Sequence, residues 1–175
     1  MRKFFPAYDD AILLYIQKAV RRPWLTPVMV LLSVSGMGGC VWICWAHFLY
    51  FHGMKAQCDL ILIAFYTANV LNDLVLKRIV KRPRPWVSCP DITQTYLRPR
   101  DSSWPSGHTA CGFSVAFAML LSGVPFAGAG LLLAAAIAFS RMYNGHHYLS
   151  DVIGGFLEAL VLLPGMAGIW FVILT

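Results

Sequence analysis

Eight residues of this chain have the chemistry needed to handle a phosphate group, and they fall in three short stretches. They are Lys77, Arg84, Ser106, Gly107, His108, Arg141, His147 and Asp151. The surrounding sequence is mostly apolar, and charged groups in or beside membrane segments are costly, so they usually mark function. A phosphoryl group in transfer spreads negative charge over several oxygens, and its site must offer cations and donors. These residue types together indicate catalysed phosphoryl transfer.

Five of these residues are suited to binding the phosphate itself. Lys77, Arg84 and Arg141 supply positive charge, and each arginine can bind two oxygens at once. Ser106 and Gly107 lie where a helix is expected to begin, so that free backbone N–H groups and the helix dipole favour an anion. Gly107 also lets the backbone approach closely, because it has no Cβ.

The two histidines are suited to different steps of one reaction. His147 and Asp151 are four residues apart and share a face if both are helical, so the carboxylate can hold one imidazole nitrogen as N–H. The other nitrogen is then free to attack phosphorus. His108 belongs to a different expected helix and can act as the general acid on the leaving oxygen. The pattern predicts a covalent phosphohistidine route.

The sequence predicts activity without a metal or another cofactor. It contains no paired-carboxylate metal motif, no Walker loop and no HExxH helix. A metal site made of His108, His147 and Asp151 is the alternative interpretation, and three nearby cations disfavour it because they would repel a metal ion. The cysteines match no zinc-binding pattern and are interpreted as small apolar residues. They are Cys40, Cys44, Cys58, Cys89 and Cys111.

The composition indicates a membrane protein. Of the 175 residues, 58% are hydrophobic and 13% are charged, against about 25% charged in a typical soluble domain. The length fits a single domain over 1–175, with an interfacial segment at 1–24 and a transmembrane core at 26–175. The formal net charge of +6 favours acidic lipid head groups or phosphorylated lipids as partners. Nucleic acid is disfavoured because no nucleic-acid-binding motif is present.

The apolar pattern predicts an all-α, polytopic membrane bundle. Residues 8–22 are expected to form an amphipathic interfacial helix, because the apolar run is too short to span and is flanked by charge. A basic, proline-rich loop is expected at 80–104, and its length favours a functional role. About five spans are expected, at 26–50, 58–79, 106–121, 126–142 and 149–173. Because consecutive spans alternate in direction, the three motif stretches all fall at one face of the membrane.

Several polar residues near the motifs have two interpretations. Asp73 is four residues before Lys77, so it forms either a local ion pair at the membrane edge or a contact that orients Lys77. Glu158 lies two turns beyond Asp151 and is either a buried supporting group or a residue facing a polar gap. His146 is interpreted as structural. Pro164 is expected to kink the last span.

The three stretches resemble the signature of the type 2 phosphatidic acid phosphatase (PAP2) superfamily. The matching patterns are Lys77-x6-Arg84-Pro85, Pro105-Ser106-Gly107-His108 and Ser140-Arg141-x5-His147-x3-Asp151. Arg82-Pro83 does not fit the first pattern, because Val75 stands where its lysine would be. The resemblance implies that His147 is the nucleophile, that Asp151 orients it and that His108 is the acid and then the base. It also implies phosphate binding by Lys77, Arg84, Ser106, Gly107 and Arg141.

The resemblance further implies an integral membrane lipid phosphatase, similar to small bacterial members that act on undecaprenyl pyrophosphate or phosphatidylglycerophosphate. Undecaprenyl pyrophosphate is the expected substrate, because the basic loop is rich enough to hold a second phosphate. The loop residues concerned are Lys81, Arg82, Arg98 and Arg100. The alternatives are a phosphatidylglycerophosphate or phosphatidic acid phosphatase, a lipid-to-lipid phosphotransferase, a vanadate-dependent haloperoxidase and a non-catalytic membrane protein that binds lipid phosphates. Membrane members of the family commonly have six spans, and this chain is interpreted as lacking the first.

The distribution of cations and the resemblance give opposite orientations in the membrane. Thirteen of the fourteen Lys and Arg residues, all but Lys55, lie on the predicted active-site face, and the positive-inside tendency would place that face in the cytoplasm. The resemblance implies the extracytoplasmic face. We expect a bacterial inner-membrane protein with an extracytoplasmic site, because many of these cations have a role in binding substrate.

Overall fold

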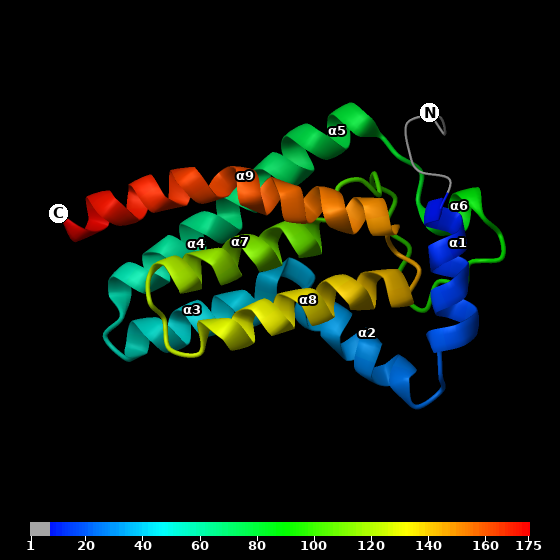
Figure 1. Ribbon diagram of the computed structural model, residues 1–175, viewed down its shortest axis with the longest axis horizontal. Coiled ribbons are helices and arrows are strands. Elements are labelled where there is room, and N and C mark those ends of the chain that lie inside the picture. Colours follow the sequence, from blue (N-terminus) through cyan, green and yellow to red (C-terminus); the bar gives the residue numbers. More distant parts are fainter. Residues whose placement is uncertain (1–7) are drawn as a thin grey trace.

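The computed structural model describes residues 8–175, and all regular elements in this range are helical (Figure 1). The first seven residues of the predicted 1–24 segment lie outside the described residues. The α-helices are α1 (Tyr8–Tyr15), α2 (Leu25–Ser35), α3 (Cys40–Phe51), α4 (Lys55–Val70), α5 (Lys77–Val80), α6 (Pro85–Ser88), α7 (Gly107–Leu121), α8 (Ala127–Tyr143) and α9 (Leu149–Leu174). Tighter or wider turns adjoin them at η2 (Ile16–Val20), η3 (Met37–Gly39) and η4 (Leu71–Leu76). The predicted all-α bundle is confirmed.

Helix α7 lies at the centre of the bundle and packs against α4, α8 and α9. Many of its buried residues are small, which lets helix backbones approach one another closely. A Cβ added to Gly112 would lie 3.3 Å from the Trp42 ring and 3.4 Å from the Ala134 side chain. Larger apolar side chains fill the remaining core, among them Leu60, Ile61, Val115, Met119 and Ile137.

The first predicted span, 26–50, is not one straight helix. Helices α2 and α3 meet at an angle of 61°, and the bend lies in η3, where Gly38 has φ +57° and Gly39 has φ +74°. Only glycine adopts this left-handed backbone region freely. Gly39 also leaves room for Phe65, whose ring would lie 2.1 Å from an added Cβ. These glycines therefore bend the segment, and Gly39 also allows close packing.

The remaining apolar segments follow the prediction closely, although they differ in length. Lys55–Ser88 and Leu149–Leu174 are each long and apolar enough to cross a membrane, and the bent α2–α3 pair gives a third candidate. Helices α7 and α8 are apolar but have only 15 and 17 residues. A membrane-spanning helix needs about 20. Helix α9 continues through Pro164 without a break, so the kink expected there does not end the helix.

The N-terminal helix packs against the end of the bundle where α8 ends and α9 begins. Leu13 and Ile16 are buried in a small apolar cluster with Tyr143 and Tyr148. Asp9, on the same helix, is also buried. The predicted interfacial helix is therefore held to the bundle by both apolar and polar contacts.

One end of the bundle collects the segments that carry the motifs (Figure 1). The end of α5, the beginning of α7, the end of α8 and the beginning of α9 all lie on the right in this view, beside α1 and α6. The turns that join α3 to α4 and α7 to α8 lie at the opposite end. The alternation of helix direction thus brings distant stretches of sequence together, as the order of the spans predicts.

Candidate active site

A cavity of about 310 Å³ opens at the motif-bearing end of the bundle. Six of the eight predicted site residues line it, namely Lys77, Arg84, Gly107, His108, Arg141 and His147. The other two, Ser106 and Asp151, are fully buried, and the Ser106 N–H donates to the Asp151 carbonyl oxygen at 3.0 Å. The structure therefore brings all eight residues into one region.

The imidazole of His147 is held in one orientation by two neighbours. Its Nδ1 lies 2.7 Å from the carbonyl oxygen of Ser103, to which it donates, so Nε2 carries no proton in the neutral ring. That Nε2 accepts from Nη1 of Arg84 at 3.1 Å. Burial lowers the pKa of His147 well below its ordinary value, and the Arg84 and Arg141 cations lower the pKa further. The ring is therefore neutral, with an unprotonated Nε2 whose lone pair faces Arg84.

The geometry corrects the predicted contact between His147 and Asp151. The nearest oxygen of Asp151, Oδ2, is 3.5 Å from Nδ1 of His147, longer than the about 2.7–3.2 Å of a good hydrogen bond. The reason is that α9 begins at Leu149, so His147 lies in the turn before the helix and not on it. The backbone carbonyl of Ser103, which no residue pattern could indicate, is the direct acceptor.

Asp151 does not line the cavity and is held by two other groups. Its Oδ2 accepts from the Tyr148 N–H at 2.9 Å, and its Oδ1 lies 2.5 Å from Nη1 of Arg82. Arg82 also pairs with Asp9 at 2.8 Å. Arg82 was predicted to be one of the cations that hold a second phosphate, whereas its guanidinium joins two buried carboxylates.

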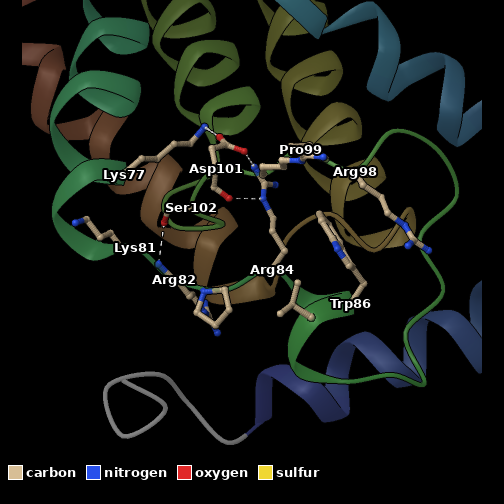
Figure 2. A pocket seen from close by; sticks show the side chains of 12 residues that line it. Lys77, Lys81, Arg82, Arg84, Trp86, Arg98, Pro99, Asp101 and Ser102 are labelled. Carbon is tan, nitrogen blue, oxygen red and sulfur yellow. Dashed lines mark hydrogen bonds and ion pairs between the residues drawn. The ribbon is translucent and has the colours of Figure 1, made fainter.

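Asp101 bridges the first two cations of the site (Figure 2). Its carboxylate accepts from Lys77 Nζ at 2.7 Å and from Arg84 Nη2 at 2.6 Å. Burial raises the pKa of Asp101, but the Arg84 and Lys77 cations lower it by more, so that the pKa lies below its ordinary value. Lys77 also pairs with Asp73 at 2.8 Å, as the spacing predicted. Asp101 was not singled out from the sequence, because it belongs to no motif.

The bent α2–α3 pair forms the wall on the side of His108 and Arg141. Nε2 of His108 lies 3.2 Å from the Ser33 carbonyl oxygen, and a Cβ on Gly36 would lie 2.8 Å from the His108 ring. Nη1 of Arg141 donates to Ser33 Oγ at 2.5 Å and to Tyr96 Oη at 2.7 Å. Its Nε is buried and has no hydrogen-bond partner within residues 8–175.

Gly107 is the first residue of α7, and α7 packs against α4 and η4. An added Cβ would lie 3.1 Å from Asn72 Oδ1 and 3.8 Å from Lys77 Nζ. Asn72 in turn donates to Glu158 at 2.7 Å, and both are buried. Glu158 is therefore a buried group that is hydrogen-bonded to the residue beside Gly107.

Residues 59–172 match the model of a family described as the PAP2 superfamily. The chain belongs to the PAP2 superfamily. It is 30% identical over 158 residues to phosphatidylglycerophosphatase B of Bacillus subtilis, covering 82% of this chain and 74% of that protein. It is 33% identical over 138 residues to the undecaprenyl-diphosphatase of Sulfolobus acidocaldarius, covering 76% of this chain and 65% of that protein.

Solved structures of PAP2 and related proteins share the fold. The crystal structure of Aquifex aeolicus LpxE matches with a TM-score of 0.76 and 26% identity, covering 97% of this chain and 96% of the other. The PAP2 type phosphatidylglycerolphosphate phosphatase of Bacillus subtilis matches with a TM-score of 0.73 and 24% identity, covering 95% and 88%. This PAP2 chain is a membrane lipid phosphatase, and the predicted family, fold class and enzyme class are confirmed.

A second pocket of about 690 Å³ adjoins the cavity of this PAP2 protein (Figure 2). Lys77, Arg84 and Asp101 line both spaces. The second pocket is also lined by Lys81, Arg98 and Arg100. These three side chains are exposed and make no ion pair within residues 8–175. We call this space the outer basic pocket.

His146 is buried and separate from the cavity. Its Nδ1 is 3.3 Å from Gln94 Nε2, and its ring packs against Tyr96 with the centroids 4.6 Å apart. These contacts agree with the structural interpretation of this histidine. Within the described residues, no three His, Cys, Asp or Glu side chains are grouped so that they could hold a metal ion.

Proposed function

We propose that this membrane protein removes a phosphate from a lipid phosphate or diphosphate through a phosphohistidine intermediate on His147. The observation that carries the proposal is the orientation of His147. Its Nδ1 is occupied by the Ser103 carbonyl, and its unprotonated Nε2 lies beside Arg84 at the cavity. A neutral imidazole fixed in this way is a nucleophile with a cation next to the position of the transferred group.

The first half-reaction forms a bond between Nε2 of His147 and phosphorus. The bond from phosphorus to the lipid oxygen breaks, the electron pair leaves with that oxygen, and His108 supplies the proton that neutralises it. Lys77, Arg84 and Arg141, together with the N–H groups at the beginning of α7, stabilise the charge on the remaining oxygens. The imidazole becomes cationic as it is phosphorylated, and Asp151 is the carboxylate nearest to it.

The second half-reaction restores the enzyme. His108 accepts a proton from a water molecule whose oxygen attacks phosphorus, the P–N bond breaks, and the electron pair returns to Nε2 of His147. Inorganic phosphate leaves, and His108 is again protonated for the next cycle. All proton transfers are carried by His108 and water, so the proposal needs no metal ion.

We further propose undecaprenyl pyrophosphate as the substrate, with the outer basic pocket holding its second phosphate. Lys81, Arg98 and Arg100 make no ion pair within residues 8–175 and line this pocket together with Lys77 and Arg84, so a diphosphate could extend from the cavity into it. Arg82 is not part of this group, because it is committed to Asp9 and Asp151. The similarity to an undecaprenyl-diphosphatase supports the same choice. Phosphatidylglycerophosphate, suggested by the relative from Bacillus subtilis, is the second candidate.

The test is phosphate release by the purified protein in detergent with excess EDTA. The substrates are undecaprenyl pyrophosphate, phosphatidylglycerophosphate, phosphatidic acid and lipid A, and His147→Ala is the control. We expect release from undecaprenyl pyrophosphate that the variant lacks. Preferred release from another lipid would reject the proposed substrate and retain the chemistry. Activity that disappears with EDTA and returns with a divalent cation would reject the metal-independent route.

We propose that the protein lies in the bacterial inner membrane with its active site on the extracytoplasmic face. Many of the cations at that end have partners or substrate-binding roles in the proposal, so they do not have to mark the cytoplasmic side. The test uses a variant with its five cysteines replaced, into which Arg98→Cys or Lys55→Cys is introduced. In intact cells, an impermeant maleimide should label the variant at 98 and not the one at 55. The reverse pattern would place the site in the cytoplasm.

A further inference from the structure

A buried chain of charges joins the N-terminal helix to the carboxylate behind His147. Arg82 lies between Asp9 and Asp151, with Nη2 2.8 Å from Asp9 Oδ2 and Nη1 2.5 Å from Asp151 Oδ1. The three side chains are 6%, 3% and 0% exposed, in the order Arg82, Asp9, Asp151. The guanidinium also lies over the Tyr148 ring, with Cζ 4.0 Å from the centroid. The planar guanidinium directs one of its terminal nitrogens at each carboxylate.

Asp9 also holds the first turn of α9. Its Oδ1 accepts from the Ser150 N–H at 3.0 Å, and its Oδ2 accepts from the Ser150 hydroxyl at 2.5 Å. A carboxylate is favourable at this end of a helix, because the N-terminal N–H groups are unpaired and the dipole is positive there. Asp151 belongs to the same turn. Helix α1 is therefore fixed to the turn that carries Asp151 by two routes, directly through Ser150 and through Arg82.

The charge of Asp151 depends on Arg82. A buried carboxylate is costly unless it is paired, and Arg82 is the cation that pairs with Asp151 within residues 8–175. The other oxygen of Asp151 faces the Tyr148 N–H and Nδ1 of His147. If Arg82 were lost, Asp151 would be left as an unpaired buried charge and would take up a proton or turn away from His147. Either change would leave the cationic phosphohistidine without its nearest carboxylate.

We propose that Arg82 and Asp9 are positioning residues for the active site. Asp9 holds Arg82, and Arg82 keeps Asp151 ionised and directed at His147, so helix α1 is a working part of the enzyme. The proposal rests on the phosphohistidine function above. Neither residue belongs to the eight predicted site residues, and neither lines the catalytic cavity.

The test compares Arg82→Gln and Asp9→Asn with two matched controls. Asp10→Asn makes the same change one residue along α1. Arg78→Gln removes an exposed arginine four residues before Arg82 in the sequence. Neither Asp10 nor Arg78 makes a hydrogen bond or ion pair within residues 8–175. For each variant we would measure kcat and KM with the lipid that the phosphate-release test identifies as the substrate. The other measurements are inhibition by orthovanadate, the level of phosphoenzyme and the unfolding midpoint.

Supporting groups behind an active-site residue are typically worth about 10–100-fold. We expect Arg82→Gln to lower kcat by about 100-fold and Asp9→Asn by about 10-fold, with KM and orthovanadate inhibition within about threefold of the wild type. The double variant should lose no more than Arg82→Gln alone, since both changes act through Asp151. The controls should keep wild-type kcat. Asp9→Glu should recover most of the loss in Asp9→Asn, because it restores the carboxylate.

Three outcomes separate the explanations. If the folded fraction falls but kcat per folded molecule is unchanged, Arg82 and Asp9 are only structural and the proposal is overturned. If Arg82→Gln does not fold, Asp9→Asn and Asp9→Glu still decide it. If the wild type forms no phosphoenzyme, or His147→Ala retains turnover, the proposed function fails independently of Arg82.

Discussion

Arg82 and Arg84 are two residues apart in one Arg-Pro repeat, yet they serve opposite sides of the active site. Arg84 contacts His147 and Asp101 beside the cavity, whereas Arg82 joins Asp9 to Asp151 behind it. Arg84 has φ −71° and ψ 155°, an extended backbone of the polyproline II type. Both arginines line the outer basic pocket, and their guanidinium groups contact different partners.

The acidic partners of the two arginines also differ in their exposure to solvent. Asp101, the partner of Arg84, is 45% exposed, and Asp9, the partner of Arg82, is 3% exposed. An exposed carboxylate can exchange with a phosphate that arrives from solvent, whereas a buried one cannot leave without stranding a charge. Two identical side chains can therefore bind a ligand or build the site, depending on the exposure of their partners.

The largest expected effect on turnover is that of replacing His147, which lines the cavity. His147→Ala should lower turnover by at least about 10⁴-fold, because it removes the nucleophile. The protein should remain folded and keep its affinity for orthovanadate within an order of magnitude. Phosphate release and the unfolding midpoint in detergent check this. Retained activity would remove the phosphohistidine from the mechanism, and with it the distinction between the two sides.

The matched pair Arg84→Lys and Arg82→Lys tests the comparison directly. Arg84→Lys should lower kcat/KM by about 100-fold and weaken orthovanadate inhibition, because a point charge cannot replace a two-pronged donor at the transferred group. Arg82→Lys should lower kcat by about 10-fold and leave orthovanadate inhibition unchanged. Steady-state kinetics of both proteins measure this. Equal effects on inhibitor binding would mean that both arginines contact the phosphate.

Asp101→Asn tests whether Asp101, unlike Asp9, competes with phosphate for its cations. Removing the charge frees Lys77 and Arg84 for phosphate, and an exposed pair is worth up to about 1 kcal/mol, or roughly a fivefold change. Inorganic phosphate should therefore inhibit Asp101→Asn up to about fivefold more tightly than the wild type. In Asp9→Asn the inhibition should not change. Weaker inhibition of Asp101→Asn would show that Asp101 orients the cations and does not compete with the ligand.

The outer basic pocket adjoins the cavity and is lined by exposed cations. Substitutions in it should therefore change KM less than those at the cavity, and only for a diphosphate substrate. The double variant Arg98→Gln, Arg100→Gln should raise KM for undecaprenyl pyrophosphate by about 3–5-fold, because each exposed pair with phosphate is worth up to about 1 kcal/mol. KM for undecaprenyl monophosphate should stay the same. Competition between the two lipids measures this. An equal rise for both would assign these arginines to general attraction of anions.

The smallest effect concerns pH and again separates the two sides. Burial and the Arg84 and Arg141 cations hold the pKa of His147 well below its ordinary value. Below about pH 6.5 the unfolded chain binds a proton at this residue that the folded protein does not, so stability falls as the pH falls. The unfolding midpoint should drop by a few degrees between about pH 7 and about pH 5.5 and should drop less in His147→Gln. The same drop in both would contradict the neutral state of His147.

The sequence alone determined the chemistry and its location in the chain. The residue types of the three stretches indicate phosphate handling, and the order of the apolar segments brings those stretches to one end of the bundle. It also distinguished the two arginines, because only Arg84 has a lysine at the required spacing, Lys77. These properties follow from local patterns and helix direction, which are encoded in short stretches of sequence.

The tertiary structure alone decided which partner each of these groups has. The acceptor of His147 is a backbone carbonyl, that of Ser103, and every residue offers such a group, so no pattern marks it. Asp9 and Arg82 are 73 positions apart, and nothing in either local sequence indicates the pair. The bend at Gly36–Gly39, which brings Ser33 to His108, depends on how α2 packs against α8. Long-range pairs of this kind follow from the path of the folded chain, because their geometry is set by packing over the whole bundle.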